Sequence, residues 1–321
     1  MTRPETKVEF PVTRLFATIL FSLTMLIAGP MASANDKYAS IVVDVKTSQV
    51  LHDRYADAPR YPASITKVMT LYMVFDALDA GQLTLDEELP VSYEAAKAPP
   101  SKLGLAPGST IKVEDAILAL VTKSANDVAV VIAERLGGSE SRFGALMTVK
   151  ARALGMENTR FYNASGLPDT RQVTTARDLS TLAVRMMDDH SGYYDYFSTR
   201  SFRYGSATYS NHNKLLGSVP GVDGIKTGYT RASGFNLMAT AERDGNRIIT
   251  IVLGGQTGRS RDAHVKDLLE AAFQAIEMTA PAAPDLRTRL AFQAIQDPSG
   301  DAATAFANSL QLEQGSAMGG E

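Results

Sequence analysis

The 321-residue sequence contains no cysteine and only four histidines. The lack of cysteine excludes thiol catalysis, cysteine-based metal sites and a disulfide framework. The histidines show no HxH, HxxxH or HExxH spacing of the kind that zinc hydrolases use; they are His52, His190, His212 and His264. If the chain is an enzyme, its nucleophile is therefore expected to be an oxygen atom, and neither a metal nor another cofactor is expected.

The sequence also lacks an excess of charge of one sign. It has 32 Lys and Arg against 35 Asp and Glu, and no block of basic residues stands out. A nucleic-acid-binding surface is therefore not indicated. A hydrophobic fraction of 45% with 21% charged residues is typical of a soluble globular protein with a substantial core. The length allows one large or two modest domains.

The N-terminus has the layout of a secretory signal peptide. Basic residues precede an uncharged apolar run over residues 15–28, and Gly29–Pro30 and a small-residue cleavage site follow. The run is short for a membrane span, which needs about 20 residues. We expect cleavage between Ala34 and Asn35, which makes residues 1–34 a signal peptide and places the mature protein in the periplasm. Acidic residues before the run leave an uncleaved anchor as the alternative.

Periodicity predicts strands at both ends of the mature chain and helices between them. Strands are expected within residues 39–57, 222–230, 234–245 and 246–256, with a hairpin turn at Asp244–Gly245. Helices are expected over residues 62–81, 113–122, 127–138, 141–155, 175–190 and 260–276. This order predicts an α/β or α+β body in which distant segments share one sheet and a helical lobe is inserted. After Met278 the composition changes, and residues 279–321 are expected to be a linker and a disordered tail.

The helix expected after Pro62 begins with a serine placed for attack. In PASITK, Lys67 follows Ser64 by three residues, so both side chains share one helix face. A serine hydroxyl is a weak nucleophile until a base takes its proton, and a buried lysine can be that base. The alternative is an ordinary helix start. A second Ser-x-x-Lys, Ser109–Lys112, leads into a short extended piece before a helix starting near Val113, so we favour Ser64.

Two more short motifs follow in the chain. Ser124 and Asn126 lie between two predicted helices, where a turn could direct them into a cleft; helix capping is the alternative. Lys226, Thr227 and Gly228 lie in a late strand, where glycine lets a substrate backbone approach; an ordinary edge-strand lysine is the alternative. Together, and in this order, the three motifs indicate a serine enzyme.

This set resembles the signature of serine penicillin-recognising enzymes, in which a Ser-Lys pair replaces Ser-His-Asp. Over residues 37–276 the chain is similar to D-alanyl-D-alanine carboxypeptidases of the S11 type, including the strings NASGLPD, TTARDLSTLA and NHNKLL. The resemblance implies a serine β-lactamase/transpeptidase-like fold, an antiparallel sheet flanked by helices with an inserted all-helical lobe. It implies a catalytic penicillin-binding domain over residues 35–278. The substrate would be the peptidoglycan pentapeptide ending in D-Ala-D-Ala, with β-lactams as inhibitors.

The resemblance also implies roles for individual residues. Ser64 would attack the carbonyl between the two D-alanines, Lys67 would be the general base, and Ser124 with Lys226 would pass a proton to the leaving amine. The substrate would be bound by Asn126, Thr227, Gly228 and the backbone N–H of Tyr229, which forms the oxyanion hole with that of Ser64. Arg261, preferred to Arg259, would bind the terminal carboxylate.

The chain departs from the family in two respects. Many relatives have a further β-rich domain and a C-terminal amphipathic helix that holds them on the membrane; this sequence shows neither, so membrane association is left open. Relatives often have histidine after Lys-Thr-Gly, where this chain has Tyr229. The backbone donor survives that change, but the fine substrate preference is open.

Three other functions compete with a carboxypeptidase. A class A β-lactamase needs a Glu-x-x-x-Asn frame between the second and third motifs, and the glutamates there lack it; four residues after Glu134, Glu140 and Glu157 stand Gly138, Gly144 and Phe161. A D,D-endopeptidase acting on peptidoglycan cross-links has closer chemistry. A non-enzymatic β-lactam sensor would react with penicillin but release no D-alanine.

Overall fold

The computed structural model describes residues 36–279. The expected signal peptide and the expected tail beyond residue 279 lie outside the described residues. Contacts divide the chain into two units, with the boundary after Lys266. The first unit holds all the motifs identified in the sequence.

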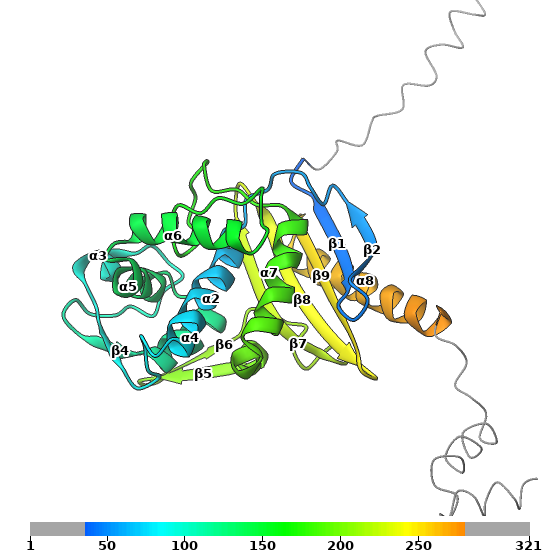
Figure 1. Ribbon diagram of the computed structural model, residues 1–321. Coiled ribbons are helices and arrows are strands. Elements are labelled where there is room, and N and C mark those ends of the chain that lie inside the picture. Colours follow the sequence, from blue (N-terminus) through cyan, green and yellow to red (C-terminus); the bar gives the residue numbers. More distant parts are fainter. Residues whose placement is uncertain (1–35, 280–321) are drawn as a thin grey trace, which may run out of the picture. The chain divides into compact units, whose positions relative to one another are not determined.

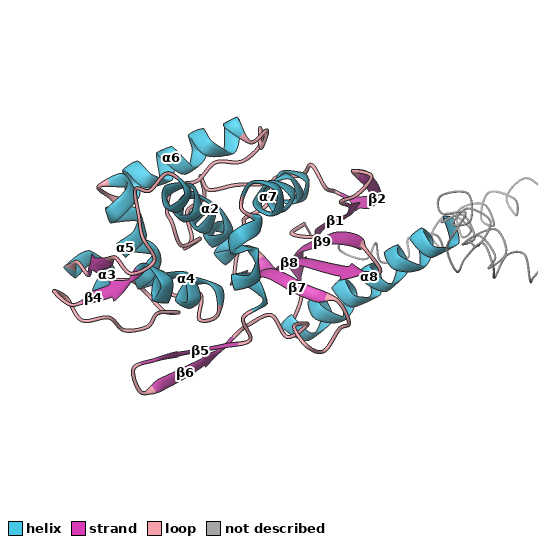
Figure 2. Ribbon diagram, turned by 60° about the horizontal axis from the view of Figure 1, so that its bottom comes forward, coloured by secondary structure: helices cyan, strands magenta, loops and turns pink. Residues whose placement is uncertain are grey.

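A five-stranded antiparallel sheet joins the two ends of this first unit (Figure 2). Its strand order is β2-β1-β9-β8-β7, with bounds Gln49–Arg54, Ala39–Asp44, Asn246–Gly255, Gly234–Arg243 and Val222–Thr230. The pairing of β1 with β9 brings segments about two hundred residues apart side by side. At the predicted hairpin turn between β8 and β9, Asp244 and Gly245 have φ of 50° and 71°, as a type I′ turn requires.

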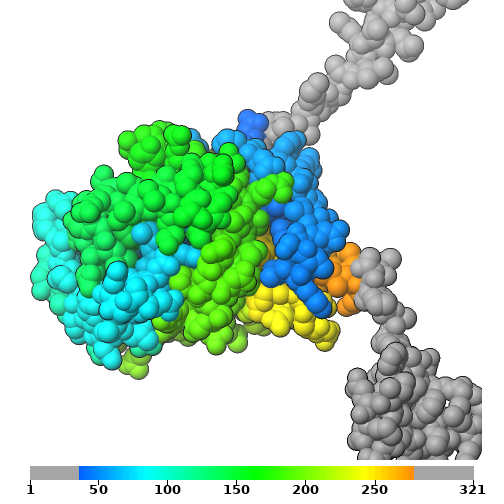
Figure 3. All heavy atoms as spheres, in the orientation of Figure 1, coloured from blue at the N-terminus to red at the C-terminus, as the bar shows by residue number. Residues whose placement is uncertain are grey.

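The chain between β2 and β7 forms the helical lobe, and α7 lies against β1 and β9 (Figure 1). Its helices are η1 (Ala63–Ile65), α2 (Thr66–Asp79), α3 (Tyr93–Lys97), α4 (Val113–Val121), α5 (Asn126–Gly137), α6 (Glu140–Ala153), α7 (Ala176–Asp189) and η2 (Ser191–Ser198). On the face shown in Figure 3, the green residues of α6 and α7 lie between the cyan residues of the lobe and the blue β1–β2 pair. The predicted antiparallel sheet with an inserted helical lobe is confirmed.

Helix α2 is the central element of the lobe, as its apolar circumference predicts. Ten of its fourteen residues are buried. Each large apolar side chain that is fully buried contributes about 1.5–3 kcal/mol to stability. The helix is therefore held firmly; its first turn carries Lys67, and η1 directly before it carries Ser64.

Short strands that the periodicity did not predict also occur. In the region expected to be mainly helical, the unpredicted β3 (Glu88–Pro90) pairs with β4 (Thr110–Lys112), which corresponds to the extended piece expected before Val113. The hairpin of β5 (Ser201–Tyr204) and β6 (Ala207–Ser210) was missed although Gly205–Ser206 is a hairpin-turn pair. The final helix α8 (Gly258–Thr279) begins near the predicted position.

Candidate active site

The three sequence motifs meet at one cleft of about 760 Å³. Its lining includes all the predicted site residues except the two lysines: Ser64, Ser124, Asn126, Thr227, Gly228, Tyr229 and Arg261. Lys67 and Lys226 are buried directly beneath, at 0% and 2% exposure. Ser109 lies elsewhere, in the turn before β4, and its partner Lys112 forms an ion pair with Asp86. The structure thus brings together the residues of the favoured Ser-x-x-Lys copy and leaves the other copy outside the cleft.

Ser64 lies in η1, a tight turn directly before α2. The residue before it, Ala63, has a φ of 49°, a left-handed conformation that costs a non-glycine residue free energy. Two glycines pack against this turn: a Cβ on Gly166 would lie 1.8 Å from the Ala63 oxygen, and one on Gly228 would lie 3.0 Å from the Ser64 nitrogen. The backbone around Ser64 is therefore enclosed by chain segments that have room only for glycine.

Lys67 Nζ has three neighbours within hydrogen-bond distance. It lies 2.8 Å from Asn126 Oδ1, 2.5 Å from the Ser165 carbonyl oxygen and 3.4 Å from Ser64 Oγ. The Asn126 orientation is fixed because its Nδ2 donates to the Pro99 oxygen at 2.8 Å. Both close partners can only accept hydrogen bonds. A neutral amine has two N–H groups for these two oxygens and one lone pair left for the hydroxyl of Ser64.

The surroundings of Lys67 favour that neutral amine. Burial, and next the charge of Lys226, lower the pKa of Lys67 well below its usual value of 10.5. Glu140 and Asp127 act in the opposite direction. A lysine with a lowered pKa can serve as a general base near neutral pH.

The Ser124–Asn126 turn links α4 to α5, and Ser124 has a φ of 59°. The N-cap of α5 is Ala125, which makes no side-chain capping bond, so the capping alternative is wrong. Ser124 Oγ is buried and has no hydrogen-bond partner within residues 36–279. Because a buried hydroxyl without a partner is costly, this atom is suited to bind a group that enters the cleft.

Lys226 lies on β7, an edge strand of the sheet. Its Nζ donates to the Thr227 oxygen at 3.0 Å. Burial, and next the charge of Arg261, lower its pKa to about 7. The alternative of an ordinary, solvated edge-strand lysine is therefore wrong. An edge strand such as β7 can pair with an extended peptide.

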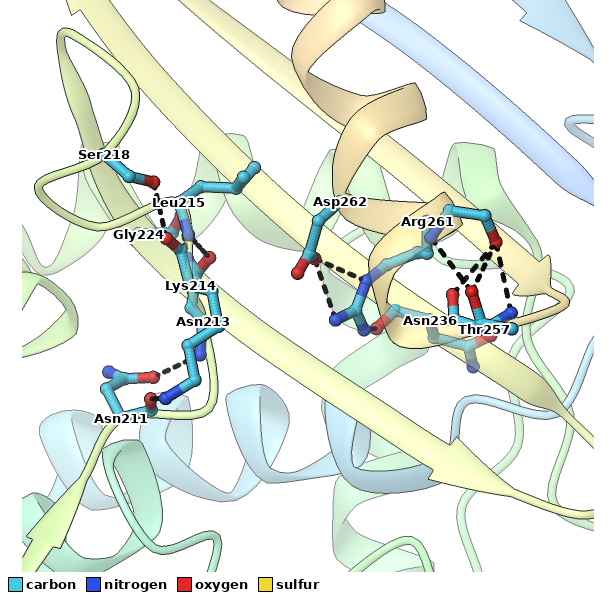
Figure 4. Close-up of polar contacts among 11 residues, drawn as sticks. Asn211, Asn213, Lys214, Leu215, Ser218, Gly224, Asn236, Thr257, Arg261 and Asp262 are labelled. Atoms are coloured by element: carbon cyan, nitrogen blue, oxygen red, sulfur yellow. Dashed lines mark hydrogen bonds and ion pairs between the residues drawn. The ribbon is translucent and has the colours of Figure 1, made fainter.

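Arg261 lines the cleft from the first turn of α8 and is 6% exposed. Figure 4 shows its guanidinium held from two sides: Nη1 donates to the Asn236 oxygen at 2.6 Å, and Nε donates to Asp262 Oδ1 at 2.8 Å. Arg259 also lines the cleft, but it is exposed. Of the two arginines weighed from the sequence, Arg261 is the one fixed in place.

Among the cleft residues that received no role from the sequence are two polar ones on a single loop. His212 and Lys214 lie on a loop that Asn213 fastens to β7, its Nδ2 donating to the Gly224 oxygen at 3.0 Å (Figure 4). The side chain of His212 is exposed at the surface of the cleft. Partial desolvation of its ring, and next the charge of Lys226, lower its pKa to about 4. The string NHNKLL was the only signal for this loop, and it did not show which side chains reach the cleft.

Residues 36–279 contain no group of three His, Asp or Glu side chains that could hold a metal ion. None of the helices in the same range is both long and apolar enough to cross a membrane.

Comparisons with known proteins show which family the chain is similar to. The family model described as D-alanyl-D-alanine carboxypeptidase matches residues 29–257. The chain is 31% identical to the carboxypeptidase DacF of Bacillus subtilis, over 82% of this chain and 72% of that protein. It is 34% identical to DacC of Escherichia coli, over 84% and 69%. It is also 34% identical to the D-alanyl-D-alanine endopeptidase of Escherichia coli, over 53% and 58%.

A solved structure of a penicillin-binding protein shows a similar fold. Penicillin-binding protein D2 of Listeria monocytogenes in its cefotaxime-bound form superposes with a TM-score of 0.67 at 34% identity. The match covers 73% of this chain and 96% of that one. The predicted serine β-lactamase/transpeptidase-like fold is thereby confirmed.

Proposed function

The chain belongs to the D-alanyl-D-alanine carboxypeptidase family, peptidase S11, and we propose that Ser64 is its nucleophile. The protein is a serine-type carboxypeptidase that removes the terminal D-alanine from D-Ala-D-Ala. One observation above all supports Ser64: the only nucleophile-type hydroxyl within hydrogen-bond distance of Lys67 Nζ, among the described residues, is Ser64 Oγ at 3.4 Å. The other two partners of that nitrogen are carbonyl oxygens.

The reaction begins when Ser64 Oγ attacks the carbonyl carbon of the penultimate D-alanine while Lys67 takes the hydroxyl proton. The carbonyl oxygen becomes an oxyanion, which the backbone N–H groups of Ser64 and Tyr229 stabilise. The close approach of Gly228 to the Ser64 nitrogen supports this pairing of donors. Positioned donors of this kind contribute roughly 3–4 kcal/mol each to the stabilisation of a transition state.

Collapse of the tetrahedral intermediate breaks the C–N bond. The Ser124 hydroxyl gives a proton to the departing amine and regains one through Lys226 and Lys67. Free D-alanine leaves, and an ester between Ser64 and the shortened peptide remains. Water then attacks this ester with Lys67 again as the base, which restores the serine.

The other cleft residues hold the substrate. Asn126 binds the amide before the scissile bond, and Thr227 aligns the peptide along the free edge of β7. Arg261 supplies the cation for the terminal carboxylate. A buried, fixed guanidinium suits a carboxylate better than a mobile one, because less side-chain entropy is lost on binding.

β-Lactams are the inhibitors expected from this chemistry, because the same attack opens their ring and leaves a stable ester on Ser64. We further propose that residues 1–34 are removed on export and that the mature catalytic domain, residues 35–278, works on the cell wall in the periplasm. N-terminal sequencing of the protein recovered from cells tests this, and an intact Met1 would contradict it.

Mass spectrometry of muropeptides incubated with the purified protein tests the activity. We expect a stem peptide ending in D-Ala-D-Ala to lose one alanine. Cleavage of a cross-linked dimer instead would favour the endopeptidase, which is also among the relatives. Penicillin labelling without release of D-alanine would favour a sensor, and rapid penicillin turnover would favour a β-lactamase.

A further inference from the structure

A further cavity of about 450 Å³ lies next to the active-site cleft, and Glu140 lines it. Glu140 is the first residue of α6, which lies beside α2 and α5 (Figures 1 and 2). Leu167 lines both this cavity and the active-site cleft. Glu140 itself is not among the residues that line the cleft.

A short segment, Ala164–Ser165, connects Glu140 to Lys67. Glu140 Oε1 accepts the backbone N–H of Ala164 at 3.1 Å. The Ser165 oxygen accepts a hydrogen bond from Lys67 Nζ at 2.5 Å, and the Ala164 oxygen accepts one from Thr70 Oγ1 at 2.7 Å. The two carbonyl groups are thus held by α2, and the N–H group is held by α6.

The charges that act on Lys67 also point to Glu140. The groups that act on it are Lys226 of β7, which disfavours the ammonium form, and Glu140 of α6 and Asp127 of α5, which favour it. The Asp127 carboxylate accepts backbone N–H groups from Leu103, Gly104, Leu105 and Val128, so it is committed to the local fold. Glu140 has one backbone partner and faces a cavity.

We propose that Glu140 is a positioning residue for catalysis, whose carboxylate holds the Ala164–Ser165 segment against Lys67 and supplies a negative charge that acts on the catalytic amine. This inference rests on the proposed function, in which Lys67 is the base. It assigns two separable effects to one side chain: the hydrogen bond fixes where the amine points, and the charge sets the pH at which the amine loses its proton.

The effect of the charge has a definite sign. Glu140 stabilises the protonated form of Lys67 and so opposes the lowering of its pKa by burial. Conversely, burial raises the pKa of Glu140 itself, while the Ala164 N–H and Lys67 lower it. Without the charge, Lys67 would lose its proton at a lower pH, and the acid limb of the rate profile would move to lower pH.

The test measures the second-order rate of Ser64 acylation by a fluorescent penicillin between pH 4 and 9. Glu140→Gln keeps an acceptor for the Ala164 N–H but removes the charge. We expect its acid limb to move to lower pH by on the order of half a pH unit, with a plateau rate within about twofold of wild type. An acid limb that stays at the wild-type pH, or moves to higher pH, would overturn the proposal.

Glu134→Gln is the matched control. Glu134 lines the same cavity, and its carboxylate accepts from Ser92 Oγ at 2.8 Å, but it is not among the groups that act on Lys67. The acid limb of the Glu134→Gln variant should coincide with that of wild type. A shift equal to that of Glu140→Gln would show that any acid in this cavity has the same effect, and the assignment to Glu140 would fail.

Glu140→Asp separates position from charge and keeps the test valid if Glu140→Gln does not fold. Aspartate keeps the charge but is too short to hold the Ala164 N–H in the same place. We expect the acid limb to stay near the wild-type pH and the plateau rate to fall about tenfold. An unchanged plateau rate would overturn the positioning role. If wild-type protein forms no penicillin adduct at all, the proposed function fails instead.

Discussion

The Nζ atom of Lys67 lies 3.4 Å from Ser64 Oγ, and its two nearer partners are carbonyl oxygens that can only accept hydrogen bonds. An ammonium group in this place would direct its third N–H at the serine oxygen. A neutral amine directs its lone pair there instead, which is the arrangement a general base needs. In the proposed mechanism, the protonation state of one buried lysine therefore decides whether Ser64 can attack.

The first prediction concerns the choice between two serines. Ser64→Ala should abolish labelling by a fluorescent penicillin, a loss of at least about a thousandfold in acylation rate, because no other hydroxyl among the described residues lies beside Lys67. Ser109→Ala is the control, since Ser109 belongs to the other Ser-x-x-Lys copy and its hydroxyl donates to the Ala106 oxygen, away from the cleft. Labelling that survives Ser64→Ala and disappears in Ser109→Ala would reverse the assignment.

The second prediction concerns the pH dependence of kcat/KM. Activity should fall at low pH as Lys67 gains a proton. It should also fall on the alkaline side, near the pKa of about 7 of Lys226, because neutral Lys226 can no longer pass a proton towards Ser124. Lys226→Arg keeps the charge at all these pH values, so we expect a lower plateau without the alkaline limb. An alkaline limb that persists in this variant would mean that another group causes it.

The third prediction concerns the glycine packed against the turn before Ser64. Gly166 has a φ of 83°, and a Cβ there would lie 1.8 Å from the Ala63 oxygen. Gly166→Ala should therefore destabilise the fold by about 2–4 kcal/mol and reduce acylation strongly. Gly192→Ala is the control, because no atom lies within 4 Å of its added Cβ. Chemical denaturation gives the free energy of unfolding of both variants. A Gly166→Ala protein as stable as wild type would contradict the expectation.

The fourth prediction separates the two cleft arginines. Arg261→Gln should lower kcat/KM for a peptide ending in D-Ala-D-Ala by about 10–100-fold, because the carboxylate loses a fixed cation. Arg259→Ala should change it by less than about twofold, as expected for an exposed charge. The same peptide with a C-terminal amide serves as the control substrate. If Arg261→Gln lowers kcat/KM equally for the peptide acid and the peptide amide, Arg261 does not bind the carboxylate.

Much of the fold follows from local patterns. Helix α2 was predicted from its apolar circumference, and the β8–β9 turn from Asp244–Gly245, because both depend on residues that are neighbours in the sequence. The β5–β6 hairpin carried a comparable signal at Gly205–Ser206 and was overlooked. At the start of α7, the Thr175 side chain accepts the N–H of Asp178, which is a local contact, whereas the Asp178 carboxylate accepts a hydrogen bond from the more distant Thr159 Oγ1.

The sequence alone determined the composition of the site: an oxygen nucleophile in a chain without cysteine, a lysine one helical turn from Ser64, and three motifs whose order indicates one family. Only the tertiary structure decided which atoms meet. The Ser165 carbonyl and Lys67 are 98 residues apart, and neither Glu140 nor His212 stands out in its own segment. Contacts between distant segments depend on how helices and strands pack, so no local pattern records them, and the environment that lowers the pKa of Lys67 exists only in the folded chain.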